Sequence, residues 1–125
     1  RAFIGGGGMS GALSYHAGLS AEEQVARDYQ RRGYPLAARR WRGKGGEIDL
    51  ITRDGEGFVF VEVKKSRSHA RAAERLSMRQ MRRLYDAASE FLALCPRGLN
   101  TVARFDVALV DGQGRIEIVE NALCA

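Results

Sequence analysis

The sequence is poor in cysteine and histidine, and it contains no long apolar run. Cys95 and Cys124 lack C-x-x-C spacing, which argues against a zinc site and is typical of a reduced, intracellular protein. His16 and His69 have no partner at metal-binding spacing, so solvated side chains are expected at both positions. No apolar run approaches the roughly 18 residues that a membrane span needs. The first twenty residues also lack the compact apolar block of a secretory signal. We therefore expect a cytoplasmic protein with no membrane segment.

The chain is long enough for one domain with a substantial core. It has 125 residues, of which 45% are hydrophobic and 28% charged, as in ordinary globular proteins. Residues 1–19 contain four consecutive glycines and are expected to be flexible, with Met9 as the start and an expression remnant before it. The single folded domain is then expected over residues 20–125.

Positive charge is concentrated in two stretches. Seven basic residues against one acid occupy residues 27–44, and eight against one acid occupy residues 64–83. Arginine predominates, and its forked guanidinium suits phosphate oxygens. With a net charge of +5, a polyanion such as nucleic acid is the natural partner. The competing interpretation is that these residues only coat two solvated helices. The expected nucleic-acid contacts are Arg39, Arg40, Arg42, Lys44, Lys65, Arg67 and Arg71.

Hydrophobic periodicity and turn residues predict the order α-β-β-β-α-β-β, a mixed α/β fold with a mixed sheet flanked by helices. The third strand is apolar on both faces and is expected to be central. The predicted elements are a helix over 20–32, strands over 36–42, 46–51 and 58–63, a helix from about 77 to 92, and strands over 105–110 and 115–119.

Acids and a lysine lie inside two apolar strands that a hairpin turn joins. Residues 54–57, Asp-Gly-Glu-Gly, form the turn signal. If the hairpin closes symmetrically, Asp49 lies opposite Glu62 and Glu47 opposite Lys64, all on one face. Glu47 and Lys64 then form either part of a site or a plain cross-strand ion pair. Asp49 facing Glu62 has no structural benefit, because like charges repel. A single bulge would turn Asp49 to the other face.

This residue set favours a divalent cation. Two carboxylates beside a lysine can hold Mg²⁺ or Mn²⁺ and place a phosphodiester next to it, with the Val63 carbonyl as a further oxygen ligand. Lys64 would orient the attacking water or stabilise charge on the phosphorus centre. Glu23 completes the set if the first helix begins near the hairpin, but it equally fits a capping box with Ser20.

Three further residues have simpler explanations. Trp41 could stack on a base, although the apolar face of a strand is the commoner role. Asp106 is interpreted as structural. Gln80 follows Ser77 at capping-box spacing, and that role suffices for it.

Three motifs in order, over residues 46–51, 59–64 and 104–107, resemble the YraN family of uncharacterised bacterial proteins. The resemblance runs from Gly18 to Leu123. That family is similar to archaeal Holliday-junction resolvases, which have a restriction-endonuclease-like core. The sequence departs from the family pattern at Ser66, where members often carry arginine, and at Gln80, where they often carry lysine. These departures affect the expected contacts with substrate and leave the expected acidic site residues unchanged.

The resemblance implies a metal site built from a helix glutamate, a strand aspartate and a Glu-x-Lys pair. Matched by position, these are Glu23, Asp49, Glu62 and Lys64, with Glu23, Asp49 and Glu62 as the metal ligands. It also implies dependence on Mg²⁺ or Mn²⁺ and a homodimer. We therefore expect a structure-specific DNA endonuclease acting on branched DNA. The alternatives are a non-catalytic nucleic-acid-binding module with a vestigial site and a protein-interaction adaptor.

Overall fold

A computed structural model describes residues 19–65 and 77–122, and within these ranges the elements follow the predicted order. Arg67 and Arg71, expected to contact nucleic acid, lie outside the described residues, as do residues 1–18 of the segment expected to be flexible. A short 3-10 helix, Gly98–Asn100, precedes β4. The main elements are α2 (Ala21–Arg31), β1 (Leu36–Arg42), β2 (Glu47–Asp54), β3 (Gly57–Lys65), α4 (Met78–Ala93), β4 (Ala103–Val110) and β5 (Ile116–Val119).

The five strands form one mixed sheet in the order β1-β2-β3-β4-β5. β3 is central, as predicted from its apolar residues. It pairs parallel with β4, and the other three pairings are antiparallel. Parallel neighbours need a crossover, and α4 is the helix in the connection between β3 and β4.

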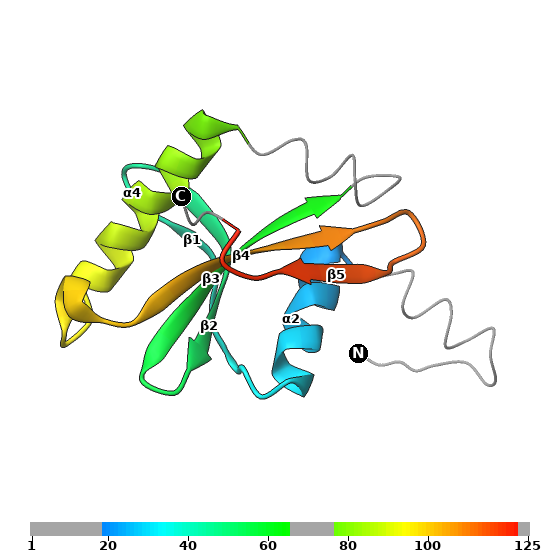
Figure 1. Cartoon of the computed structure of the whole chain (residues 1–125), viewed down its shortest axis with the longest axis horizontal. Coiled ribbons are helices and arrows are strands. Elements are labelled where there is room, and N and C mark those ends of the chain that lie inside the picture. Colours follow the sequence, from blue (N-terminus) through cyan, green and yellow to red (C-terminus); the bar gives the residue numbers. More distant parts are fainter. Residues whose placement is uncertain (1–18, 66–76, 123–125) are drawn as a thin grey trace.

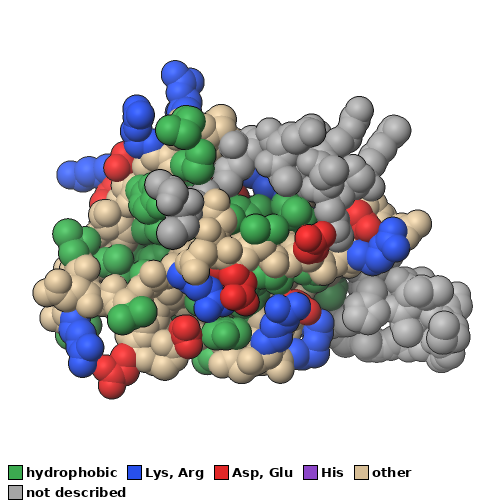
Figure 2. Space-filling model, in the orientation of Figure 1, with side chains coloured by type: hydrophobic (Ala, Val, Ile, Leu, Met, Phe, Trp, Pro, Cys, Tyr) green, Lys and Arg blue, Asp and Glu red, His purple; other side chains and the backbone are tan. Residues whose placement is uncertain are grey.

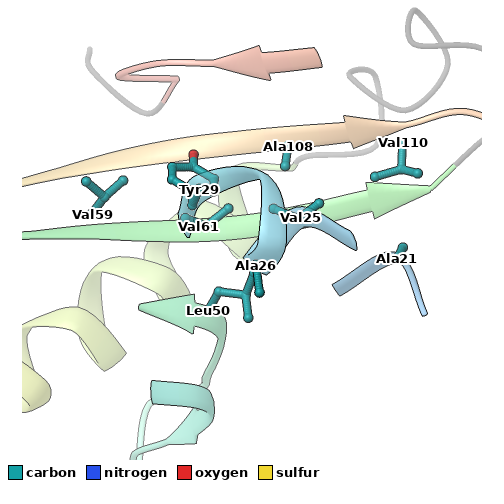
Figure 3. Packing of buried hydrophobic residues seen from close by; sticks show 9 residues of the cluster. All are labelled: Ala21, Val25, Ala26, Tyr29, Leu50, Val59, Val61, Ala108 and Val110. Atoms are coloured by element: carbon teal, nitrogen blue, oxygen red, sulfur yellow. The ribbon is translucent and has the colours of Figure 1, made fainter. Parts of the chain in front are cut away.

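The two helices cover opposite faces of this sheet (Figure 1). Alternation along β3 separates the two cores, because Val59 and Val61 pack under α2 whereas Phe58 and Phe60 pack under α4. The α2 core also contains Val25, Ala26, Tyr29 and Leu50 (Figure 3). The fold is therefore a three-layer α/β/α arrangement.

Side-chain caps fix where the helices begin. Ser20 accepts a hydrogen bond from the Glu23 backbone N–H at 3.1 Å at the start of α2. The capping box of Ser77 and Gln80 predicted from the sequence is present at the start of α4. Gly33 follows α2 with φ of +95°, a conformation that favours glycine. Within the described ranges, neither helix has the length and hydropathy to cross a membrane.

Glycines dock the β1–β2 loop against α4. Glu90 of α4 accepts hydrogen bonds from the backbone N–H groups of Lys44 and Gly45, both at 2.8 Å. A Cβ on Gly45 would come within 2.6 Å of the Asp86 Cβ, and one on Gly46 would lie 3.1 Å from the Arg83 carbonyl oxygen. Only residues without a side chain allow the loop and helix to approach this closely. The contact fixes the start of β2 next to α4.

Candidate active site

The hairpin of β2 and β3 closes in the predicted register. The pairs run from Asp54 opposite Gly57 to Leu50 opposite Val61, and Gly55 in the turn has φ of +59°. At the next position toward the start of β2, a side chain accepts the hydrogen bond from β3. The Asp49 Oδ2 accepts it from the Val63 backbone N–H at 2.8 Å. This bond holds the Asp49 carboxylate against β3.

Asp49, Glu62 and Lys64 meet in the structure as the sequence indicated. The carboxyl groups of Asp49 and Glu62 are hydrogen-bonded to each other. The Lys64 Nζ lies 3.3 Å from the Glu62 Oε2. Only 16% of the Glu62 side chain and 14% of the Lys64 side chain are exposed, so water screens these charges weakly. The three groups form a small, largely desolvated charged cluster, which we call the acid pair and its lysine.

Burial and mutual repulsion make this acid pair hard to ionise fully. Desolvation, and then the charge of Asp49, raise the pKa of Glu62 to about 7, although Lys64 acts in the opposite direction. Desolvation also raises the pKa of Asp49, which the hydrogen bond from Val63 partly offsets. The two carboxyl groups therefore hold protons more readily than separate, solvated carboxyl groups would. A cation that binds both groups would compete with protons for them.

Glu47 does not join the cluster. Its carboxylate is 3.8 Å from the Arg42 guanidinium, at the exposed start of β2. The alternative in which Glu47 pairs with Lys64 across the strands is therefore wrong, because Lys64 is next to Glu62 on its own strand.

Glu23, the expected third ligand, faces arginines instead of the acid pair. Its carboxylate accepts a hydrogen bond from Arg39 of β1 and lies 3.4 Å from Arg27. The Arg39 hydrogen bond is the main reason that the pKa of Glu23 lies below its usual value. Its backbone is capped by Ser20, but no reciprocal side-chain bond to Ser20 accompanies this cap in the described ranges. The structure therefore does not bring Glu23 to Asp49 and Glu62.

Sequence reasoning missed Glu22, the neighbouring acid in the first turn of α2. After desolvation, its negative charge is one of the influences that raise the pKa of Asp49, so Glu22 is near enough for the two charges to interact. Successive helix residues are about 100° apart, and this rotation separates the directions of Glu22 and Glu23. Two adjacent glutamates gave the sequence no signal by which to choose between them.

The donor chemistry of the acid pair fits a divalent cation in part. Two carboxylates that repel each other in a desolvated site supply the hard oxygen ligands that Mg²⁺ and Mn²⁺ prefer. Across residues 19–65 and 77–122, however, no three acidic, histidine or cysteine side chains are grouped closely enough to hold a metal ion. The remaining ligands would therefore come from a backbone carbonyl such as that of Val63, from water, or from a rearranged helix glutamate.

The expected nucleic-acid contacts within the described ranges are at the surface. These are Arg39, Arg40, Arg42, Lys44 and Lys65, all exposed. The nearby Trp41 takes its commoner role: its ring packs edge-on against Phe91 of α4, with centroids 5.5 Å apart.

Asp106 has the structural role expected of it. It is 1% exposed, and it accepts hydrogen bonds from the Tyr29 hydroxyl at 2.7 Å and from Arg104 at 3.0 and 3.2 Å. Burial and the hydrogen bond to Asp106 raise the pKa of the Tyr29 hydroxyl well above its ordinary value. This network ties α2 to β4 and so fixes the helix that carries Glu22 and Glu23.

Comparison with known proteins places these features in a family. Residues 21–110 match the family described as "Uncharacterised protein family UPF0102". A UPF0102 protein of Cereibacter sphaeroides (strain KD131) is 68% identical over 117 residues, which cover 94% of this chain and all of that protein. One of Ruegeria pomeroyi is 64% identical over 112 residues, covering 90% of this chain and 91% of the relative.

Among solved structures, the crystal structure of a repair endonuclease from Pyrococcus abyssi is similar with a TM-score of 0.46 and 19% identity. The match covers 74% of this chain and 39% of that one. The sequence matches are much stronger, and by them the chain belongs to the uncharacterised protein family UPF0102.

Proposed function

We propose that this protein is a metal-dependent endonuclease that hydrolyses phosphodiesters in DNA, with branched DNA as its preferred substrate. The observation that carries the proposal is the acid pair and its lysine. Asp49 and Glu62 share a desolvated site, and the Lys64 ammonium is 3.3 Å from Glu62. Such an arrangement costs folding free energy, and a catalytic role accounts for that cost better than a structural one.

The residues of the acid pair and its lysine would have different roles in hydrolysis. Asp49 and Glu62 would hold Mg²⁺ or Mn²⁺, which supplies Lewis-acid polarisation of a phosphoryl oxygen and acidifies water. Lys64 would orient the attacking water or stabilise negative charge that develops on the phosphate. Because Glu62 and Lys64 are both largely buried, this charge stabilisation would operate with little screening.

The exposed basic residues of β1 and its following loop would position the substrate. Arg39, Arg42 and Lys44 precede β2 in the chain, and β2 carries Asp49. A DNA backbone held by their side chains would lie close to the acid pair. Cutting both strands of a branched substrate would require two copies, so we also propose a homodimer, which light scattering would test.

The proposal is tested by incubating the purified protein with branched and linear duplex DNA in Mn²⁺. Glu62→Gln removes one ligand charge while keeping the size of the side chain, so cleavage should fall by at least a hundredfold. Glu56→Gln is the matched control, because Glu56 is exposed at the hairpin turn and forms an ion pair with Arg97, away from the acid pair. Equal cleavage by the wild type and Glu62→Gln would overturn the proposal and indicate a contaminating nuclease.

A second candidate is a nucleic-acid-binding module with a vestigial site. The observation that favours it is Glu23, whose carboxylate contacts Arg39 and Arg27 instead of Asp49 and Glu62. This candidate predicts DNA binding without product in Mn²⁺ or Mg²⁺, and unchanged affinity in Glu62→Gln. Affinity should fall steeply with salt in both cases. A flat response would favour a protein-interaction adaptor instead.

A further inference from the structure

The first half of α4 carries an unusual concentration of positive charge. Arg79, Arg82 and Arg83 are all exposed, and their spacing places them on neighbouring positions of the helix surface. Lys and Arg side chains project from the side of the molecule that α4 forms (Figure 2). The sequence indicated charge in this part of the chain without identifying which residues form one surface.

The charges of these three arginines have no partner that would account for them structurally within residues 19–65 and 77–122. The first turn of α4 contains no acidic residue, and positive charge near a helix N-terminus opposes the helix dipole. No acid within residues 19–65 and 77–122 forms an ion pair with Arg79, Arg82 or Arg83. Asp86 follows Arg82 and Arg83 by one turn, but within the described part of the chain no ion pair joins it to either arginine.

The glycine loop connects this part of α4 to the strand that carries Asp49. Gly46 lies against the Arg83 backbone, and Gly45 against Asp86 one turn further along α4. The loop therefore runs along α4, with Gly46 at Arg83 and the Lys44 backbone at Glu90 in the second half of the helix. Gly46 is three residues before Asp49, so a strand rise of 3.3 Å per residue places Asp49 about 10 Å along the backbone from Gly46.

We propose that these side chains form a basic ridge that binds the sugar-phosphate backbone of duplex DNA next to the acid pair. The inference rests on the proposed function in taking DNA as the ligand. The ridge consists of Arg79, Arg82 and Arg83.

Among the described residues, Trp41 and Tyr85 both pack against other aromatic rings, which favours duplex over single-stranded DNA as the ligand. Single strands are held largely by bases stacked on exposed aromatic rings. Trp41 is packed edge-on against Phe91, and the partly exposed Tyr85 packs on Phe105 with centroids 4.7 Å apart. The ridge thus offers guanidinium groups, which contact phosphates without regard to base sequence.

The test compares two double variants of equal net charge. One carries Arg79→Gln and Arg82→Gln on the ridge. The other carries Arg53→Gln and Arg97→Gln near the hairpin turn, where Arg97 contacts Glu56. Binding of a short fluorescent duplex is measured by anisotropy in EDTA, so that no cleavage occurs, at salt concentrations from about 50 to 200 mM.

Each phosphate contact contributes about 0.9 to the slope of log affinity against log salt. The ridge variant should therefore lose about 1.8 from this slope and bind at least tenfold more weakly at low salt. The hairpin variant should match the wild type. Equal slopes for the wild type and the ridge variant, or equal losses in both variants, would overturn the inference. Tighter binding of an oligothymidine single strand than of the duplex would also overturn it.

The outcomes distinguish this inference from the proposed function. If the protein binds duplex DNA through the ridge but does not cleave it in Mn²⁺, the ridge proposal stands and the nuclease proposal is refuted. If cleavage depends on Glu62 but the ridge variant has the same slope of log affinity against log salt as the wild type, the nuclease proposal stands and the ridge proposal is refuted.

Discussion

Replacing Glu62 with glutamine should stabilise the metal-free protein at neutral and alkaline pH. The fold raises the pKa of Glu62 from 4.5 to about 7. At 1.36 kcal/mol for each pH unit, ionising Glu62 in the folded state costs at most about 3 kcal/mol. Glutamine keeps the size of the side chain and its hydrogen bonding to Asp49 without the second negative charge, so it removes most of this cost.

The pH dependence has a definite sign. Below pH 4.5 Glu62 is protonated in both the folded and unfolded states, so no cost arises. As pH rises from 4.5 to about 7, the unfolded state loses its proton first, and the free energy of unfolding falls. Above pH 7 the free energy of unfolding is lowered by the full cost of ionising Glu62 in the folded state.

Urea denaturation from pH 5 to pH 8.5 in EDTA measures this effect. The difference between Glu62→Gln and the wild type should grow with pH and level off at about 2 to 3 kcal/mol. Titrating groups remote from Glu62 cancel in that difference, and the exposed Glu56→Gln should parallel the wild type. Parallel pH curves for Glu62→Gln and the wild type would refute the reasoning, because Glu62 would then have an ordinary pKa.

Three other substitutions test separate parts of the structure. Lys64→Gln should reduce Mn²⁺-dependent cleavage by about a hundredfold with little loss of DNA affinity, because it removes charge stabilisation at the phosphate; a binding assay beside the cleavage assay separates the two effects. Gly45→Ala should lower the free energy of unfolding by about 1 to 3 kcal/mol, since its Cβ meets a helix atom at 2.6 Å. Gly112→Ala, where a Cβ meets nothing within 4 Å, should be close to neutral in the same urea denaturation. Asp106→Ala should cost about 3 to 5 kcal/mol by leaving the Arg104 guanidinium without its buried partner, and an unchanged melting temperature would contradict this.

Local patterns were sufficient for the hairpin. The turn at residues 54–57 and two apolar strands allow few registers, and Arg53 does lie opposite Phe58 as a symmetrical closure requires. That register brings Asp49 to Glu62. The prediction succeeded because alternation along a strand and the conformational demands of a tight turn act over only a few residues.

The surroundings of Glu23 could not be predicted in the same way. Whether its carboxylate faces Arg39 or the acid pair depends on how α2 is rotated over the sheet. That rotation is set by contacts far apart in sequence, such as the Tyr29 hydroxyl on Asp106. Sequence proximity likewise gives no hint that Glu90 would bind the backbone of Lys44 and Gly45.

The central claim is that Asp49 and Glu62 together bind a divalent cation. The most direct test is an anomalous difference map from a crystal soaked in Mn²⁺. The account predicts one peak at about 2.1 to 2.2 Å from an oxygen of each carboxylate, which disappears in Glu62→Gln. Two results would contradict this claim. One is a Mn²⁺ peak at other residues only, and the other is no peak beside Asp49 and Glu62 when Mn²⁺ is present at millimolar concentration.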